Sequence, residues 1–223
     1  MYKFKVVEKF VSINGEGKRA GELACFIRLA GCNLHCNYCD TAWANEPHVA
    51  CELMTSDEIY EYVVGTKVQN VTITGGEPLK DENITELLTK LSSNEYLRIE
   101  VETNGSIPIT KFGMIADNIT FTIDYKLLGS GMTSEMRIEN FETARRKDTI
   151  KFVVSNHADL LQTKNIIQMY GLDDNSATVY ISSAFAEMEP KDIVQFMIEN
   201  NMNNIKYQLQ MHKYIWESDR KGV

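Results

Sequence analysis

Short β-rich runs alternate with segments of helical spacing along most of this chain, and this alternation constrains the fold more than any other feature. Strands are predicted at Ala24–Leu29, Asn70–Thr74, Leu97–Glu102, Ile119–Asp124, Thr149–Val154, Thr178–Ile181 and Ile205–Leu209. Because strands that alternate with helices form βαβ units, we expect a mostly parallel α/β sheet. So many strands in 223 residues favour an incomplete, open (βα) barrel, with a flat doubly wound sheet as the competing architecture.

The segments between these runs carry helix signals. The tetrapeptide at 55–58, Thr-Ser-Asp-Glu, is a capping box in front of apolar residues. Further helices are predicted at Asp81–Leu91, Ile138–Arg146, Ala158–Tyr170 and Pro190–Asn200. The sequence contains no internal repeat and no Pro/Ser-rich linker, so we expect one domain over residues 1–223. It would comprise an N-terminal segment (1–23), a core (24–209) and a C-terminal tail (210–223).

Composition and charge indicate the cellular compartment and exclude some classes of partner. The net charge of −8 argues against non-specific nucleic-acid binding, which needs a basic face. No run approaches the ~20 apolar residues of a membrane span, and the first residues lack an apolar segment followed by a cleavage site. We therefore expect a cytoplasmic protein. Because cytoplasmic thiols stay reduced, a dense cysteine cluster there predicts metal binding or catalysis rather than disulfides.

Three of the five cysteines have the spacing C-x3-C-x2-C: Cys32, Cys36 and Cys39. Three thiolates on one short loop can hold three irons of a [4Fe–4S] cluster and leave the fourth iron open to a cofactor or substrate. Two alternatives remain: a structural zinc site, with His35 or His48 as fourth ligand, and an electron-transfer cluster completed by Cys51. By contrast, Cys25 lies in an apolar run and is expected to be a buried, inert thiol.

This cysteine spacing, with an aromatic residue before the third cysteine, resembles the signature of radical S-adenosylmethionine enzymes. In that family the cofactor chelates the open iron, and its reductive cleavage yields a 5′-deoxyadenosyl radical that takes hydrogen from the substrate. The segment Gly75-Gly76-Glu77-Pro78 follows a predicted strand and resembles the family's GGE motif. The resemblance assigns S-adenosylmethionine binding to Tyr38, Cys39, Asp40, Gly76, Asp124, Tyr125, Lys126 and Ser182. For Asp124, Tyr125, Lys126 and Ser182, which lie at the ends of predicted strands, the alternative is simple exposure to solvent.

A narrower resemblance rests on the segments Phe10–Gly17, Phe26–Cys32, Cys39–Thr41 and Gln208–Lys213. They are similar to 7-carboxy-7-deazaguanine synthases of queuosine precursor biosynthesis. The resemblance implies ring contraction of 6-carboxy-5,6,7,8-tetrahydropterin to 7-carboxy-7-deazaguanine with loss of ammonia, driven by the cofactor radical without an assigned catalytic side chain. It implies Mg²⁺ on the Thr41 hydroxyl, for which an N-cap is the alternative role. It also implies substrate contacts from Ile13, Asn14, Gly15, Arg28 and Thr74, with a side chain extending to solvent as the alternative for Arg28.

The same resemblance implies an external electron donor such as flavodoxin or ferredoxin, and a homodimer. We expect no nucleic-acid or membrane partner. Two other functions stay open: a glycyl-radical enzyme activase, and a non-catalytic iron–sulfur or zinc module. The sequence departs from the family where Glu22 follows Gly21 in place of Gly-x-Pro, and where Tyr38 replaces a frequent tryptophan. The roles of Glu16, Cys51, His212 and Lys213 are not defined by any pattern.

Overall fold

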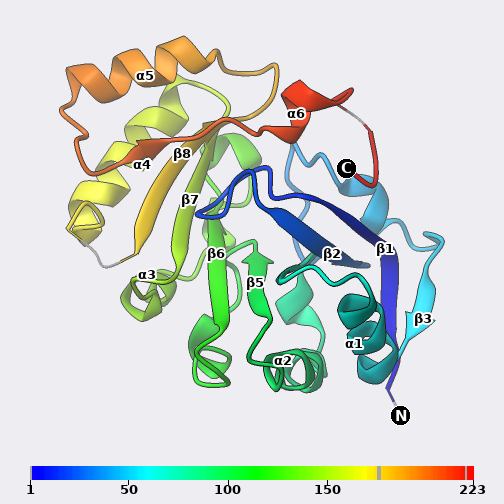
Figure 1. The fold of residues 1–223 in the computed structure, drawn as a ribbon. Coiled ribbons are helices and arrows are strands. Elements are labelled where there is room, and N and C mark those ends of the chain that lie inside the picture. Colours follow the sequence, from blue (N-terminus) through cyan, green and yellow to red (C-terminus); the bar gives the residue numbers. More distant parts are fainter. Residues whose placement is uncertain (1, 175–176, 219) are drawn as a thin grey trace.

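One curved sheet organises the chain in the computed structural model, which describes residues 2–174, 177–218 and 220–223. Its strand order is β3-β1-β2-β4-β5-β6-β7-β8-β9. The strands are β1 (Phe4–Ile13), β2 (Leu23–Leu29), β3 (Glu52–Met54), β4 (Asn70–Gly75), β5 (Arg98–Thr103), β6 (Ile119–Tyr125), β7 (Thr149–Val154), β8 (Thr178–Ser183) and β9 (Lys206–Tyr207). Every pairing from β2 to β9 is parallel. The predicted open, mostly parallel sheet is therefore confirmed (Figure 1).

Two strands were missed by the sequence analysis. The N-terminal segment contains β1, which pairs antiparallel with β2 and with the three-residue β3. Charged residues interrupt the apolar pattern of β1, and its register shifts between Val6 and Glu8. The last strand is shorter than predicted, because the chain turns after Tyr207 toward the N-terminal loop, where Gln208 bonds both the N–H and the carbonyl of Gly17.

The helices surround the outer side of the sheet, except the last, which lies beside the loop that follows β1 (Figure 1). They are α1 (Ser56–Gly65), α2 (Ile84–Ser92), α3 (Glu139–Thr143), α4 (His157–Tyr170), α5 (Pro190–Glu199) and α6 (His212–Ile215). Short 3-10 turns are η1 (Ala42–Asn45), η2 (Pro78–Lys80), η3 (Ile109–Lys111), η4 (Leu128–Ser130) and η5 (Thr133–Glu135). The predicted capping box is present at α1, where Thr55 and Glu58 exchange both bonds. Two helices are shorter than predicted: α2 starts only after the extended Asp81, and α3 ends at the extended Ala144.

The central strands separate apolar from polar side chains by simple alternation. In β4, β5 and β6 the residues Val71, Ile73, Ile99, Val101, Phe121 and Ile123 are buried in the apolar core with the helices. Their neighbours in sequence, Thr72, Thr74, Glu100 and Thr122, are buried but polar. Because successive side chains of a strand point to opposite faces, the concave inner face is lined with hydroxyl and carboxyl groups. Within the described ranges, every helix is too short or too polar to span a bilayer.

Candidate active site

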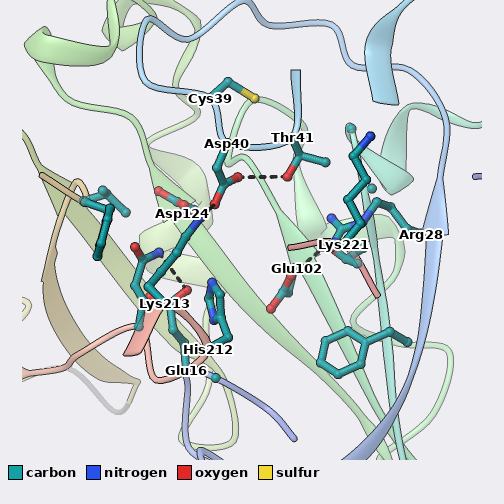
Figure 2. A pocket seen from close by; sticks show the side chains of 18 of the residues that line it. Glu16, Arg28, Cys39, Asp40, Thr41, Glu102, Asp124, His212, Lys213 and Lys221 are labelled. Atoms are coloured by element: carbon teal, nitrogen blue, oxygen red, sulfur yellow. Dashed lines mark hydrogen bonds and ion pairs between the residues drawn. The ribbon is translucent and has the colours of Figure 1, made fainter. Parts of the chain in front are cut away.

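A cavity of about 460 Å³ lies on the concave face, above the carboxyl ends of the parallel strands. Most residues that the sequence analysis assigned to cofactor, metal or substrate line it: Ile13, Gly15, Arg28, Cys32, Cys36, Tyr38, Cys39, Asp40, Thr41, Thr74, Gly76, Asp124 and Lys126. The side chains of Asn14, Tyr125 and Ser182 are buried beside it and are not among the residues that line it. Ligands collect at this end of parallel α/β sheets, so the cavity is the candidate active site (Figure 2).

The cysteine loop begins directly after β2. Its three thiols face one cavity, whereas His35, His48 and Cys51 do not line it. Among the described residues, no three His, Cys, Asp or Glu side chains converge tightly enough to hold a single metal ion. Burial raises the pKa of Cys36, so binding of iron there must displace its proton.

Hydrogen bonds fasten the far half of this loop to the ends of later strands. Asn37 donates its backbone N–H to the carbonyl of Ser130 (3.1 Å) and its side-chain N–H to the carbonyl of Gly129 (3.0 Å). The hydroxyl of Tyr38 donates to the carbonyl of Val153 at the end of β7 (3.1 Å). Burial raises the pKa of Tyr38, so this hydroxyl remains a donor. The loop shape is therefore set by contacts more than 90 residues away.

The Gly-Gly pair after β4 lies against the backbone of the cysteine loop. A Cβ atom on Gly76 would be 2.1 Å from the carbonyl oxygen of Gly31, and one on Gly75 would be 2.2 Å from that of Leu29. Only glycine permits so close an approach of two backbones. The next residue, Glu77, points away from the cavity into the core, where it accepts bonds from other residues. The motif thus aligns two loops as well as opening space for a ligand.

A chain of alternating charges forms the floor of the cavity. Lys151 Nζ lies 3.2 Å from Glu16 and 3.3 Å from Asp124, and Asp124 is 3.0 Å from Lys126 Nζ. Although burial opposes the charge, the carboxylates of Glu16 and Asp124 raise the pKa of Lys151 well above its usual value. Burial likewise disfavours ionised Asp124, yet the two lysines lower the pKa of this carboxyl. Lys151, Asp124 and Lys126 are therefore charged at neutral pH, and Glu16 is held in place by its contact with Lys151.

Two further pairs lie along the wall. Arg28 donates from Nε to a carboxylate oxygen of Glu8 (2.9 Å), and Thr74 donates its hydroxyl to Glu102 (2.7 Å). Both side chains of the Arg28 pair are mostly buried, so Arg28 does not extend to solvent. The sequence analysis missed Glu8, Glu102 and Lys151. For Lys151 the signal was a charged residue in an otherwise apolar strand, as for Arg28. The strands β1 and β5 carry several charged residues each, so no such contrast marked Glu8 or Glu102.

Thr41 lies beside Asp40, as Figure 2 shows. It precedes η1, but its side chain makes no capping bond; its hydroxyl donates to a carboxylate oxygen of Asp40 (2.8 Å). The other oxygen of Asp40 lies 3.4 Å from Lys213 Nζ. Since the proton of Thr41 is directed at Asp40, the lone pairs of its oxygen remain available to a cation.

The two ends of the chain close the side of the cavity. His212 packs so tightly on Gly15 that a Cβ there would be 2.3 Å from its Nδ1 atom. The backbone N–H of Met211 donates to the carbonyl of Gly15 (3.0 Å). Further along, the Lys221 ammonium lies 3.8 Å from the centre of the Trp43 ring. The last residues of the tail also line the cavity, so the C-terminal segment is part of its wall.

Comparisons with known proteins agree with this geometry. Residues 26–167 match the family model of the Radical SAM superfamily. The chain is 50% identical over 220 residues to 7-carboxy-7-deazaguanine synthase of Clostridium acetobutylicum, covering 99% of each protein. It is 34% identical to the enzyme of the same name from Chlorobaculum tepidum, covering 98% of this chain and 96% of the relative.

Solved structures show the same fold. The crystal structure of QueE from Escherichia coli superposes with a TM-score of 0.72 at 21% identity, covering 92% of this chain and 94% of that one. A radical SAM methyltransferase from Sphaerobacter thermophilus gives a TM-score of 0.59 at 14% identity, covering 83% and 66%. The sequence similarity extends over nearly the whole chain, the fold is shared, and the cysteine motif lines the cavity. These findings lead to one conclusion. The chain belongs to the radical S-adenosylmethionine superfamily and, within it, to the 7-carboxy-7-deazaguanine synthase family.

Proposed function

We propose that this chain contracts the ring of 6-carboxy-5,6,7,8-tetrahydropterin to 7-carboxy-7-deazaguanine with release of ammonia. The observation that carries the proposal is the 50% identity, over 99% of the chain, to a curated enzyme of that name. The cavity supports it, because one space unites the cysteine motif, the Gly-Gly motif and a row of charges. A small polar substrate and a nucleoside cofactor both suit such a site.

The residues present fit a [4Fe–4S] cluster and S-adenosylmethionine. We assign the cluster to Cys32, Cys36 and Cys39, whose thiols share the cavity. When bound, the cluster and the cofactor supply a radical that removes hydrogen from the substrate. Cofactor contacts are assigned to Tyr38, Cys39, Asp40, Gly76, Asp124, Tyr125, Lys126 and Ser182. The ring of Tyr125 packs against Phe141 and Phe152, and the hydroxyl of Ser182 donates its proton to Glu16, which leaves the lone pairs of that oxygen as acceptors.

The chain's own side chains then orient the substrate and exclude water. Arg28 is assigned to the pterin carboxylate, since Glu8 binds its Nε and no described residue is hydrogen-bonded to the terminal nitrogens of its guanidinium group. Thr74, Ile13, Asn14 and Gly15 are assigned to the pterin ring. The backbone N–H and carbonyl of Asn14 bond Glu22 and Gly21 (2.8 Å each), and its Oδ1 accepts from the hydroxyl of Thr72 (2.9 Å). Among the described residues nothing pairs with its buried Nδ2, which is the group it can offer. The C-terminal wall shields the reacting atoms from solvent.

Replacing Glu8 with glutamine is expected to raise the KM for the pterin about tenfold, because a neutral partner positions Arg28 less firmly at the substrate carboxylate. The kcat should change much less. Steady-state kinetics under anaerobic conditions measures both. Glu52→Gln is the matched control. Glu52 of β3 pairs with Lys9 of β1 at the edge of the sheet and does not line the cavity. An unchanged KM in Glu8→Gln would mean that Arg28 does not bind the substrate carboxylate.

Magnesium is proposed to bind the Thr41 hydroxyl together with the substrate carboxylate and water. Mg²⁺ prefers hard oxygen ligands and often takes few from the protein. Thr41→Ala should raise the Mg²⁺ concentration needed for half-maximal activity about tenfold or more, whereas Thr41→Ser, which keeps the hydroxyl, should stay close to the wild type. Activity against Mg²⁺ concentration, at full cluster loading, is the measurement. Loss of the cluster in Thr41→Ala would mean that Thr41 supports the loop instead.

Anaerobic incubation with the pterin, S-adenosylmethionine, reductant and Mg²⁺ tests the reaction as a whole. We expect the deazapurine product without net consumption of S-adenosylmethionine, since hydrogen returns to the cofactor. Stoichiometric methionine formation without this product would favour a glycyl-radical activase. A colourless, zinc-bound protein after reconstitution with iron and sulfide would eliminate both radical functions and leave a binding module.

The remaining assignments concern the protein's setting. We propose that residues 1–223 act as one domain, that the electron comes from a flavodoxin or ferredoxin, and that the enzyme is a cytoplasmic homodimer without nucleic-acid or membrane partners. The net charge of −8 supports the absence of non-specific nucleic-acid binding. Light scattering of the purified protein tests the dimer, and reduction assays with each carrier test the donor.

A further inference from the structure

Three side chains form a closed ring of hydrogen bonds beside the first cysteine. Asn33 donates to the hydroxyl of Ser106 (2.8 Å), Ser106 donates to Oδ1 of Asn104 (2.6 Å), and Asn104 Nδ2 donates to Oδ1 of Asn33 (3.1 Å). Asn33 belongs to the cysteine loop, whereas Asn104 and Ser106 follow β5. The ring therefore fastens the near half of the loop to the end of a central strand.

The amide of Asn104 has a single possible orientation. Its oxygen accepts from both the hydroxyl and the backbone N–H of Ser106, the latter at 3.0 Å. A backbone N–H can only donate, so the oxygen must face Ser106 and the NH2 group must face the cysteine loop. The backbone of Asn104 is fixed as well, because its own N–H donates to Glu77 (2.6 Å). The side chain is buried, at 7% exposure.

The second N–H of this amide is directed at a thiol. Asn104 Nδ2 lies 3.4 Å from Sγ of Cys32, and the backbone N–H of Leu34 is at the same distance from that sulfur. Cys32 thus faces one side-chain donor and one backbone donor. Donors that point at a cysteine ligand withdraw electron density from it and favour the reduced, more negative state of an iron–sulfur cluster.

We propose that Asn104 is a positioning residue that raises the reduction potential of the cluster through its hydrogen bond to Cys32. The proposal rests on the proposed binding of the cluster by Cys32, Cys36 and Cys39. Neither the cysteine spacing nor the Gly-Gly motif contains this residue, and its position comes from the turn after β5. Its role is to ease the one-electron reduction that must precede cleavage of the cofactor.

Asn104→Leu removes the donor at nearly constant side-chain volume. In anaerobically reconstituted protein without S-adenosylmethionine, we expect a more negative midpoint potential for one-electron reduction by dithionite in the presence of mediators. At a fixed solution potential the ratio of reduced to oxidised cluster should fall about threefold to tenfold, as expected for one charge-assisted hydrogen bond. Electron paramagnetic resonance of the reduced cluster measures this ratio independently of turnover.

Asn33→Ala is the matched control, because it removes the other bond of the same amide and leaves the one to Cys32 in place. Its potential should stay close to that of the wild type. Equal shifts in the two variants would overturn the proposal in favour of loop position, and a wild-type potential in Asn104→Leu with full iron content would overturn it directly. Should Asn104→Leu bind less iron, the smaller Asn104→Ala, which also lacks the donor, decides the question: a shift in the same direction supports the proposal, and a wild-type potential overturns it. A wild-type protein that binds no cluster would instead refute the proposed function.

Discussion

Cys36→Ala is expected to lose the iron–sulfur cluster and all product formation. Three thiolates are the minimum that holds a cube with one open corner, and the described part of the chain offers no substitute, since His35, His48 and Cys51 lie outside the cavity. The variant should lack the broad visible absorbance of the reconstituted wild type, contain almost no bound iron and sulfide, and leave S-adenosylmethionine intact under dithionite. Iron content, absorbance and cofactor cleavage are the three measurements.

Two other cysteines provide the controls. Cys51 is exposed, so Cys51→Ala should keep iron content, cofactor cleavage and stability unchanged. Cys25 is fully buried in the core, so Cys25→Ala should keep the cluster but destabilise the fold by about 1 kcal/mol through a small cavity. Iron loss in Cys51→Ala would identify a four-cysteine, electron-transfer cluster. A full cluster in Cys36→Ala would contradict the assigned ligands altogether.

The sequence predicted those parts of the fold that depend on local patterns of residues. Alternating apolar runs gave β4, β6, β7 and β8 to within two residues, and the capping box gave the start of α1. The open sheet followed from the order of these elements. By contrast, charged residues interrupt the apolar pattern of the long strand β1. It is stabilised as a strand by pairing with β2 on one side and β3 on the other. Such tertiary pairing leaves little local signal.

The site divides in the same way. Residues within short motifs were located directly: Cys32 by the spacing of the cysteines, and Gly76 by the resemblance of its segment to a family motif. Contacts between remote segments were not: Gln208 with Gly17 and Asn33 with Ser106 join polar residues of loops that carry no periodicity. Inward charges form an intermediate class. Lys151 stands out in an apolar strand just as Arg28 does, and applying that criterion to every strand would have identified it. Glu102 does not stand out, because β5 also carries Arg98 and Glu100.

Glu77→Ala is expected to lower the free energy of unfolding by roughly 3–5 kcal/mol and the Tm by about 10 °C. The carboxyl of Glu77 is 3% exposed and accepts from the N–H groups of Leu79 (2.9 Å) and Asn104 (2.6 Å) and from the hydroxyl of Thr103 (2.9 Å). Its removal leaves three buried donors without a partner. Glu82→Ala is the matched control: this neighbouring glutamate is exposed and should change stability by less than about 0.5 kcal/mol. Thermal and denaturant unfolding measure both.

The pH dependence of the protein's stability shows whether burial or hydrogen bonding dominates the pKa of Glu77. Burial raises the pKa of Glu77 to about 7 from 4.5, although the three donors act to lower it. A carboxyl whose pKa is raised by folding stabilises the protein most below its unfolded pKa and loses that contribution as the pH rises through the folded value. Between about pH 6 and about pH 8 the wild type should therefore lose about 1 kcal/mol more stability than Glu77→Gln, which cannot titrate. Because the buried Glu100 has the same raised pKa in both proteins, its effect cancels in the difference. Parallel stability curves would mean that Glu77 stays ionised throughout, with the three donors outweighing burial.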